Sequence, residues 1–159
     1  MSLWGAVAGG LVGTVVLTTG LRLAQEVGLT RMDIPLLLGT AFSEDRRRAN
    51  AIGYALHFLN GMLFALAYAG IFFAVGRAGW IFGALLGVVH SAFAGGALIN
   101  VLLPAVHPRM GTPWSDAEDA PLLEPPGFML LNYGRQTLVG NLVAHAAYGA
   151  IVGGFTAGF

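Results

Sequence analysis

The sequence predicts an all-α, polytopic membrane protein with four transmembrane helices, and three observations lead to this fold class. The chain of 159 residues is 56% hydrophobic and only 10% charged, with a mean hydropathy of +0.72, whereas a soluble domain carries about a quarter charged residues. Four apolar runs approach or exceed the roughly 20 residues needed to cross about 30 Å of hydrocarbon. The charges gather between these runs. The length allows a single domain over residues 1–159.

The four predicted spans are residues 3–21, 51–75, 80–106 and 137–159. Arg22 and Glu26 form an i,i+4 pair that continues the first helix into the headgroups, and Pro104 interrupts the third. The connection 76–79 is short, so the helices beside it are expected to form a tight antiparallel hairpin. The other two connections are long and polar. The N-terminus lacks a basic n-region and is interpreted as a retained helix, not a cleaved signal peptide.

Arginine placement predicts the orientation. Arg77 lies in the short connection, and the other seven arginines lie in or beside the long ones. Cytoplasmic loops carry the excess of positive charge, so the long connections are expected on the cytoplasmic side and both termini outside. Trp4 and Trp80 would then mark the outer interface. The expected location is the inner or plasma membrane of a bacterium.

Composition also narrows the function classes. The chain has no cysteine and no lysine, which excludes disulfides, thiolate metal sites and cysteine nucleophiles. The run 46–48 is the only basic patch, so no nucleic-acid partner is expected. No familiar nucleophile or nucleotide-binding motif is present, and Ser91 makes a poor dyad with His90 because adjacent helical residues point apart. No catalytic residue is assigned, and an enzyme is not expected.

An ordered set of motifs occurs twice, which predicts an internal repeat of about residues 1–76 and 79–159. Asp-x-Pro-Leu-Leu is found at 33–37 and 119–123, preceded by GGLVG at 9–13 and GALLG at 83–87. His-x-x-x-Gly follows at His57 and His145, ten residues after Arg47 and Arg135. Both hairpins start on the same side, which predicts a parallel repeat about an axis along the membrane normal. Convergence of low-complexity apolar helices is the alternative.

The aspartates of the repeated motif are expected to cap short helices. Asp33 and Asp119 each precede a proline in the first turn, where a missing N–H costs nothing. These short helices would lie on the membrane surface or between the long helices. Pro125 and Pro126 should shorten the second one. A catalytic role for either aspartate is the alternative.

Small residues at a spacing of four predict close helix contacts, because helices in lipid associate through packing. The predicted contact positions are Gly5, Gly9, Gly13, Gly53, Gly61, Ala65, Ala69, Gly79, Gly83, Gly87, Ser91, Gly95, Gly149, Gly153 and Ala157. Such faces build a tight bundle and can also drive dimers.

Five polar residues within the spans form the candidate binding site: His57, His90, His145, Asn60 and Asn141. His57 and His145 fall on the small-residue faces, so both should point into helix contacts. Helical rise places the three histidines in one layer about 5 Å thick. Ionisable residues inside a membrane are functional candidates by default.

Three interpretations of this layer remain open. The histidines could be neutral, hydrogen-bonded packing residues. They could instead bind a transition metal, or a haem ligated by His57 and His145 from opposite faces. The third interpretation is a proton or small-solute path, for which the outer half offers little polar lining.

Other polar residues lie near the ends of the spans. His107 is expected to be solvated or bound within its loop. Asp116, Glu118 and Asp119 are interpreted as a solvated turn, with a weak cation site as the alternative. Asn132 and Tyr133 should anchor the interface.

The segments MDIPLLLGTAF, GYALHFLNG, RAGWIFGALLGVVH, HPRMG, EPPGFMLLNYG and HAAYGAIVGG carry a resemblance along nearly the whole chain. They resemble a group of small bacterial four-helix membrane proteins of unknown function, which implies a fold and no chemistry. Our hypothesis is a membrane protein whose histidine cluster binds a metal, haem or small ligand. The alternatives are a non-catalytic packing or assembly subunit of a homo-oligomer or larger membrane complex, and a transporter or channel.

Overall fold

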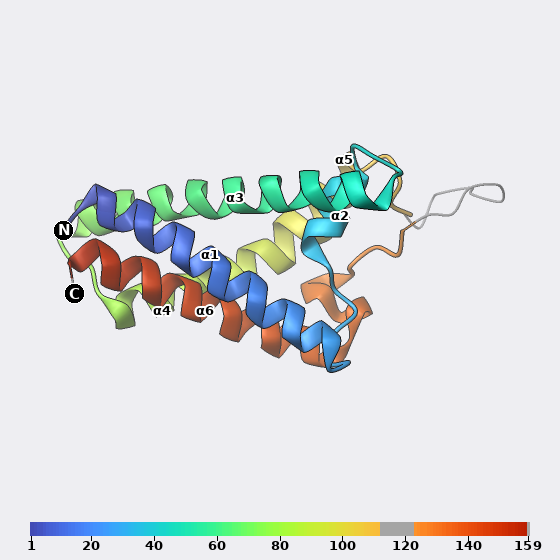
Figure 1. Cartoon of the computed structure of the whole chain (residues 1–159). Coiled ribbons are helices and arrows are strands. Elements are labelled where there is room, and N and C mark those ends of the chain that lie inside the picture. Colours follow the sequence, from blue (N-terminus) through green and yellow to red (C-terminus); the bar gives the residue numbers. More distant parts are fainter. Residues whose placement is uncertain (112–122, 159) are drawn as a thin grey trace.

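A computed structural model describes residues 1–111 and 123–158, and this part of the chain is helical. Four helices are long and apolar enough to span a membrane: Leu3–Glu26, Arg46–Val75, Trp80–Val106 and Arg135–Ala157. The first, second and fourth are α1, α3 and α6. Both termini lie at the end of the molecule that holds the turn at residues 76–79, and the long connections lie at the other end (Figure 1). The all-helical prediction with four such helices is confirmed.

The helix ends differ from the predicted spans for local reasons. α3 begins at Arg46 and not at residue 51, because the side chain of Asp45 caps the helix and accepts a hydrogen bond of 2.9 Å from the N–H of Arg48. A cap of this kind satisfies a backbone donor that the first turn leaves free. α1 runs to Glu26, where Arg22 forms the expected ion pair with Glu26 at 3.2 Å.

The third long helix changes its winding along its length. It consists of α4 (Trp80–Phe93), the π-helix η1 (Ala94–Leu102) and the short α5 (Leu103–Val106). Pro104 cannot donate a backbone hydrogen bond, and its ring would collide with the carbonyl of Asn100 in a regular α-helix. The wider π-helix precedes this proline. π-helical segments are rare and are often found at functional sites.

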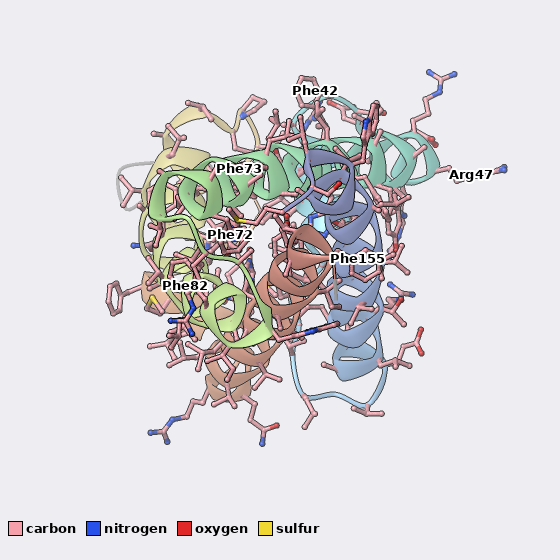
Figure 2. The ribbon with its side chains drawn as sticks, turned by 90° about the vertical axis from the view of Figure 1, so that its left-hand side faces the viewer. Phe42, Arg47, Phe72, Phe73, Phe82 and Phe155 are labelled. Carbon is pink, nitrogen blue, oxygen red and sulfur yellow. The ribbon has the colours of Figure 1, made fainter. Side chains whose placement is uncertain are left out.

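The expectation of a tight hairpin between α3 and α4 is wrong. α4 packs along α6, α6 packs along α1, and α1 packs along α3, whereas α3 and α4 make little backbone contact. Large aromatic side chains separate α3 from the third helix. Phe72 of α3 and Phe82 of α4 point toward one another (Figure 2), with ring centroids 5.5 Å apart. Small residues allow two helices to approach closely, and large rings prevent it. The size of the side chains therefore decides which helices pack together.

Glycines lie where the paired helices approach most closely. A Cβ atom added at Gly83 or Gly149 would overlap the backbone of the other helix, and one at Gly87 would overlap the carbonyl of His145. A Cβ at Gly5 would likewise overlap Phe155 at the contact between α1 and α6. These contacts lie within the chain.

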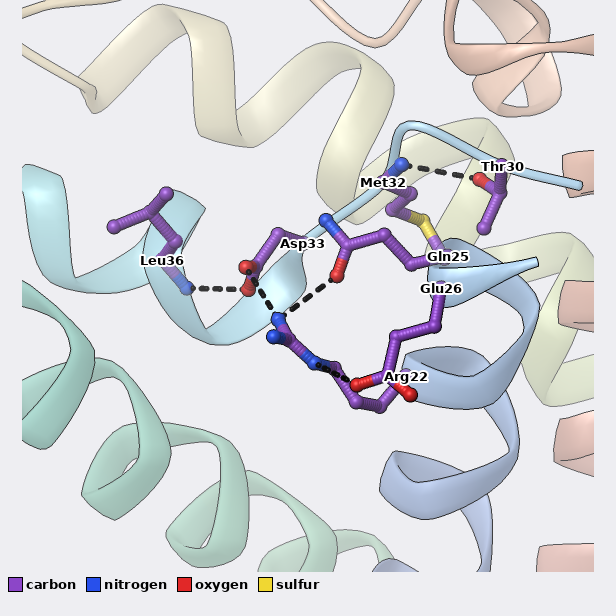
Figure 3. A network of polar contacts seen from close by, with 7 residues as sticks. All are labelled: Arg22, Gln25, Glu26, Thr30, Met32, Asp33 and Leu36. Atoms are coloured by element: carbon purple, nitrogen blue, oxygen red, sulfur yellow. Dashed lines mark hydrogen bonds and ion pairs between the residues drawn. The ribbon is translucent and has the colours of Figure 1, made fainter. Parts of the chain in front are cut away.

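The short helix α2 (Ile34–Thr40) packs on the first turns of α3. Gly39 of α2 and Gly53 of α3 meet so closely that a Cβ atom on either would overlap the other helix's backbone. Asp33 is the N-cap, and its Oδ1 accepts from the N–H of Leu36 at 3.0 Å. Its other carboxylate oxygen lies 3.6 Å from Arg22 (Figure 3). The second capping candidate, Asp119, lies outside the described residues, as do Asp116 and Glu118.

The first long connection is fastened to the second and to the first turn of α6. The hydroxyls of Thr30 and Thr137 lie 2.6 Å apart, and the N–H of Arg31 donates to the carbonyl of Tyr133 at 3.0 Å. The 3-10 helix η2 (Phe128–Tyr133) contains two residues with left-handed backbone angles, Met129 and Leu130. Such angles are rare outside glycine. The side chain of Leu130 is completely buried in the core, which opposes the strain.

Candidate ligand-binding cavity

A cavity of about 320 Å³ lies between α1, α3, η1 and α6, on the side where aromatic rings hold α3 away from the third helix. Most of its wall is apolar. All five site residues expected from the sequence, His57, His90, His145, Asn60 and Asn141, line it. Residues far apart in the sequence are therefore brought around one space. Pockets for small molecules are typically apolar with a few convergent polar groups.

His90 and His145 are in direct contact across the boundary between α4 and α6. Their ring centroids lie 4.7 Å apart in an edge-to-face arrangement, and the ring of His90 also stacks on Phe64 with centroids 3.7 Å apart. This separation leaves no room for a porphyrin between these two rings. Haem ligation by His57 and His145 stays a prediction.

The orientation of His145 is set by its own helix. Its Nδ1 lies 2.8 Å from the backbone carbonyl of Asn141, an acceptor, so Nδ1 carries the proton. The side-chain amide of Asn141 donates to the hydroxyl of Ser91 at 2.8 Å and links α6 to α4. Asn141 and Ser91 are both buried, and this bond satisfies polar groups that would otherwise be costly in the interior.

His57 is held by the hydroxyl of a threonine on α1. The hydroxyl of Thr18 donates to the carbonyl of Thr14 at 2.6 Å, and Nε2 of His57 lies 3.0 Å from the same hydroxyl oxygen. Because that hydroxyl proton is already used, Nε2 of His57 is the donor. Asn60, one turn further along α3, is exposed at the edge of the cavity.

Two buried polar atoms have no hydrogen-bond partner among the described residues: the hydroxyl of Tyr68 and Nδ1 of His90. Tyr68 is only 4% exposed, and its ring contacts His90 with centroids 5.9 Å apart. Unsatisfied buried polar groups are rare and call for a water, an ion or a functional role. Both atoms belong to the aromatic cluster beside the cavity.

Sequence reasoning missed the aromatic members of this cluster, namely Phe64, Tyr68, Phe72 and Tyr148. A signal was present, since three of them recur at a spacing of four on α3 and Tyr148 follows His145 by three residues. Positions three and four apart share one helix face. The hydroxyl of Tyr148 donates to the carbonyl of Gly61 across the bundle, which links α6 to α3.

The described residues contain no group of three histidine, aspartate or glutamate side chains arranged to hold a metal ion. Structural zinc sites use four protein ligands and catalytic ones use three. A metal bound beside this histidine layer would therefore depend on fewer protein ligands than usual.

His107 was expected to be solvated or bound within its loop; it is not solvated, and it is bound both within its loop and to the helix α2. His107 is 4% exposed. Its Nε2 donates to the carbonyl of Leu37 at 3.0 Å, and its Nδ1 accepts from the N–H of Arg109 at 3.1 Å. Arg109 in turn donates to the carbonyl of Thr40 and pairs with Glu44 at 3.3 Å. His107 thus joins the end of the third helix to α2.

Replacing His107 with alanine should lower the free energy of unfolding by about 1–3 kcal/mol. The substitution leaves the N–H of Arg109 without its acceptor and removes one of the two donors to the carbonyl of Leu37. Thermal unfolding in mild detergent would measure the loss. The neighbouring Val106→Ala is a matched control, because Val106 is 66% exposed and its truncation should cost within about 0.5 kcal/mol. Equal effects of the two substitutions would contradict the joint assigned to His107.

The expected interface anchors, Asn132 and Tyr133, hold the connection before α6. The amide of Asn132 donates to the carbonyl of Pro125 at 2.9 Å, and the hydroxyl of Tyr133 donates to the carbonyl of Glu124 at 2.8 Å. Burial, with a smaller contribution from the Glu124 carboxylate, raises the pKa of Tyr133 to about 12. Tyr133 is thus more deeply buried than we expected for a residue that anchors the membrane interface.

Fold and site together define a bundle of four helices long enough to span a membrane, with a mostly apolar cavity between them that five polar side chains line. Comparison with protein-family models, with curated proteins and with solved structures finds no match to this chain.

Proposed function

We propose that this is an integral membrane protein that binds a small, largely apolar ligand in the cavity beside its histidine cluster. The observation that carries the proposal is the convergence of all five polar site residues on one apolar-walled space of about 320 Å³. Small-molecule sites fall in the range of about 300–1,000 Å³. The apolar wall would hold the body of the ligand and the histidine layer would meet its polar group.

The cavity favours ligand binding over a pure packing role for the histidines. A packing role predicts that helices close around the polar residues, whereas here α3 is held away from the third helix beside them. Asn60 is exposed within a span. Polar side chains within membranes usually face a bundle interior or cavity, and a position at the cavity edge gives Asn60 such a role.

The proposal includes the membrane setting expected from the sequence: long connections cytoplasmic, termini outside and a bacterial inner membrane. It also retains the two-fold repeat, in which His57 and His145 occupy equivalent positions.

The small-residue contacts support a compact chain, since the close contacts found at these glycines are internal. Assembly into a homo-oligomer or larger complex and a transport role remain the rival functions.

Purification in mild detergent tests the proposal. Native mass spectrometry should detect a small molecule retained by the protein, and His57→Ala and His145→Ala should each weaken its affinity by about tenfold or more, which corresponds to about 1.4 kcal/mol of binding. His107→Ala is the control, because His107 lies outside the cavity lining and should change stability alone.

The same preparation separates the alternatives. A haem absorption band or stoichiometric metal, lost in the His57 and His145 variants, would replace the apolar ligand with a cofactor. A colourless, metal-free protein that retains no small molecule, and whose variants lose only stability, would contradict ligand binding and favour the assembly role.

A further inference from the structure

Three hydrogen-bond donors around the cavity are already used inside the protein. His145 donates from Nδ1 to the carbonyl of Asn141, and His57 donates from Nε2 to Thr18. The hydroxyl of Tyr148 donates to the carbonyl of Gly61. A neutral imidazole has one donor and one acceptor nitrogen. Nε2 of His145 and Nδ1 of His57 are therefore left as acceptors.

The imidazoles around the cavity are expected to be neutral on grounds of charge. The described residues that line the cavity include no aspartate, glutamate, arginine or lysine. A buried cation without a partner is very costly in an apolar surrounding. His57 and His145 thus offer lone pairs to a ligand, and the described lining residues offer it no fixed charge.

We infer that the cavity selects a ligand whose polar group is a hydrogen-bond donor, namely the hydroxyl of an alcohol or phenol carried on an apolar body. This inference rests on the proposed function and names its ligand class. A hydroxyl supplies the proton that the free imidazole nitrogens accept. An ether or ester of the same shape presents only oxygen lone pairs, and leaves those nitrogens unpaired.

A hydroxyl also suits the polar group at the edge of the cavity. A hydroxyl both donates and accepts, so it can give its proton to an imidazole nitrogen and accept a hydrogen bond from the amide of Asn60. The amide of Asn60 at the edge offers further acceptor and donor capacity to the ligand.

The test compares para-octylphenol with its O-methyl ether, which differ in the hydroxyl proton and one methyl group. Native mass spectrometry of the full chain in mild detergent counts the bound molecules during titration. The phenol should bind about tenfold more tightly or better, because a site that hydrogen-bonds a hydroxyl discriminates against an analogue that lacks it. Equal binding, or tighter binding of the ether, overturns the inference and leaves the proposed function standing. If neither probe binds, both the inference and the proposed function are overturned.

Thr18→Val supplies a readout that a merely structural role would not change. It removes the oxygen that holds the proton on Nε2 of His57, so the ring is free to present its N–H to the cavity. The preference for the phenol over the ether should shrink, whereas a structural defect would weaken both probes equally. Thr19→Val is the matched control, since Thr19 is exposed and does not line the cavity.

Nuclear magnetic resonance of protein labelled with nitrogen-15 histidine reads the tautomers without any ligand. His57 should carry its proton on Nε2 and His145 on Nδ1. The opposite tautomer at both rings would contradict the inference, whatever the two probes show.

Discussion

Gly149→Val should prevent the bundle from forming a stable fold, with a loss of about 3 kcal/mol or more, at the upper end of what overpacking costs. A Cβ atom at Gly149 overlaps the carbonyl oxygen of Gly83 and approaches the N–H of Gly87. These are backbone atoms, so no side-chain rotation relieves the overlap and α4 must move away from α6. Because this contact also positions His90 against His145, the cavity should be lost with it.

The measurement is the unfolding midpoint in mild detergent, together with the yield of monodisperse protein. Gly140→Ala in the same helix is the control, because nothing lies within 4 Å of a Cβ atom at Gly140. Alanine is favoured over glycine in a helix by about 0.5–1 kcal/mol, so this variant should be as stable as the parent or slightly more. A Gly149→Val protein as stable as the parent would show that α4 and α6 do not pack through this contact.

Ala94→Phe should weaken ligand binding strongly while the protein stays folded. Ala94 begins the π-helix and lines the cavity, and a phenyl ring there would occupy a substantial part of about 320 Å³. The affinities for para-octylphenol and for its ether should both fall by about tenfold or more, equivalent to about 1.4 kcal/mol. The loss is independent of the head group because it removes volume and leaves the hydrogen-bonding groups in place.

Val101→Phe controls for adding a ring to the same helix. Val101 is 62% exposed and does not line the cavity, so binding should be unchanged. Native mass spectrometry supplies the affinities, and the unfolding midpoint shows that each variant is folded. Unchanged binding in a folded Ala94→Phe protein would move the ligand out of this cavity.

Much of the candidate site could be predicted from the sequence. The shared His-x-x-x-Gly motif singled out His57 and His145, and helical rise placed His90 at a similar depth. All three line one cavity. The polar partners were harder to foresee. Thr18, which sets the tautomer of His57, lies 39 residues away in the sequence, and no local pattern relates the two.

The shape of the site could not be predicted in the same way. Phe64, Tyr68 and Phe72 share one face of α3, but their spacing alone does not say which helix they meet. The short turn after α3 favoured close packing with α4, and that expectation was wrong. The burial of His107 was missed for a similar reason, since its partner Leu37 belongs to a different connection.

The sequence by itself determined the class of fold and the long helices, because the hydrocarbon thickness requires about 20 apolar residues per span and four runs supply them. Only the tertiary structure decided which helices pair and where space remains. The physical reason is that close packing depends on the match between two faces. Between α4 and α6, glycines lie against the backbone of the facing helix. Between α3 and the third helix, aromatic rings contact one another, and the cavity lies beside these rings.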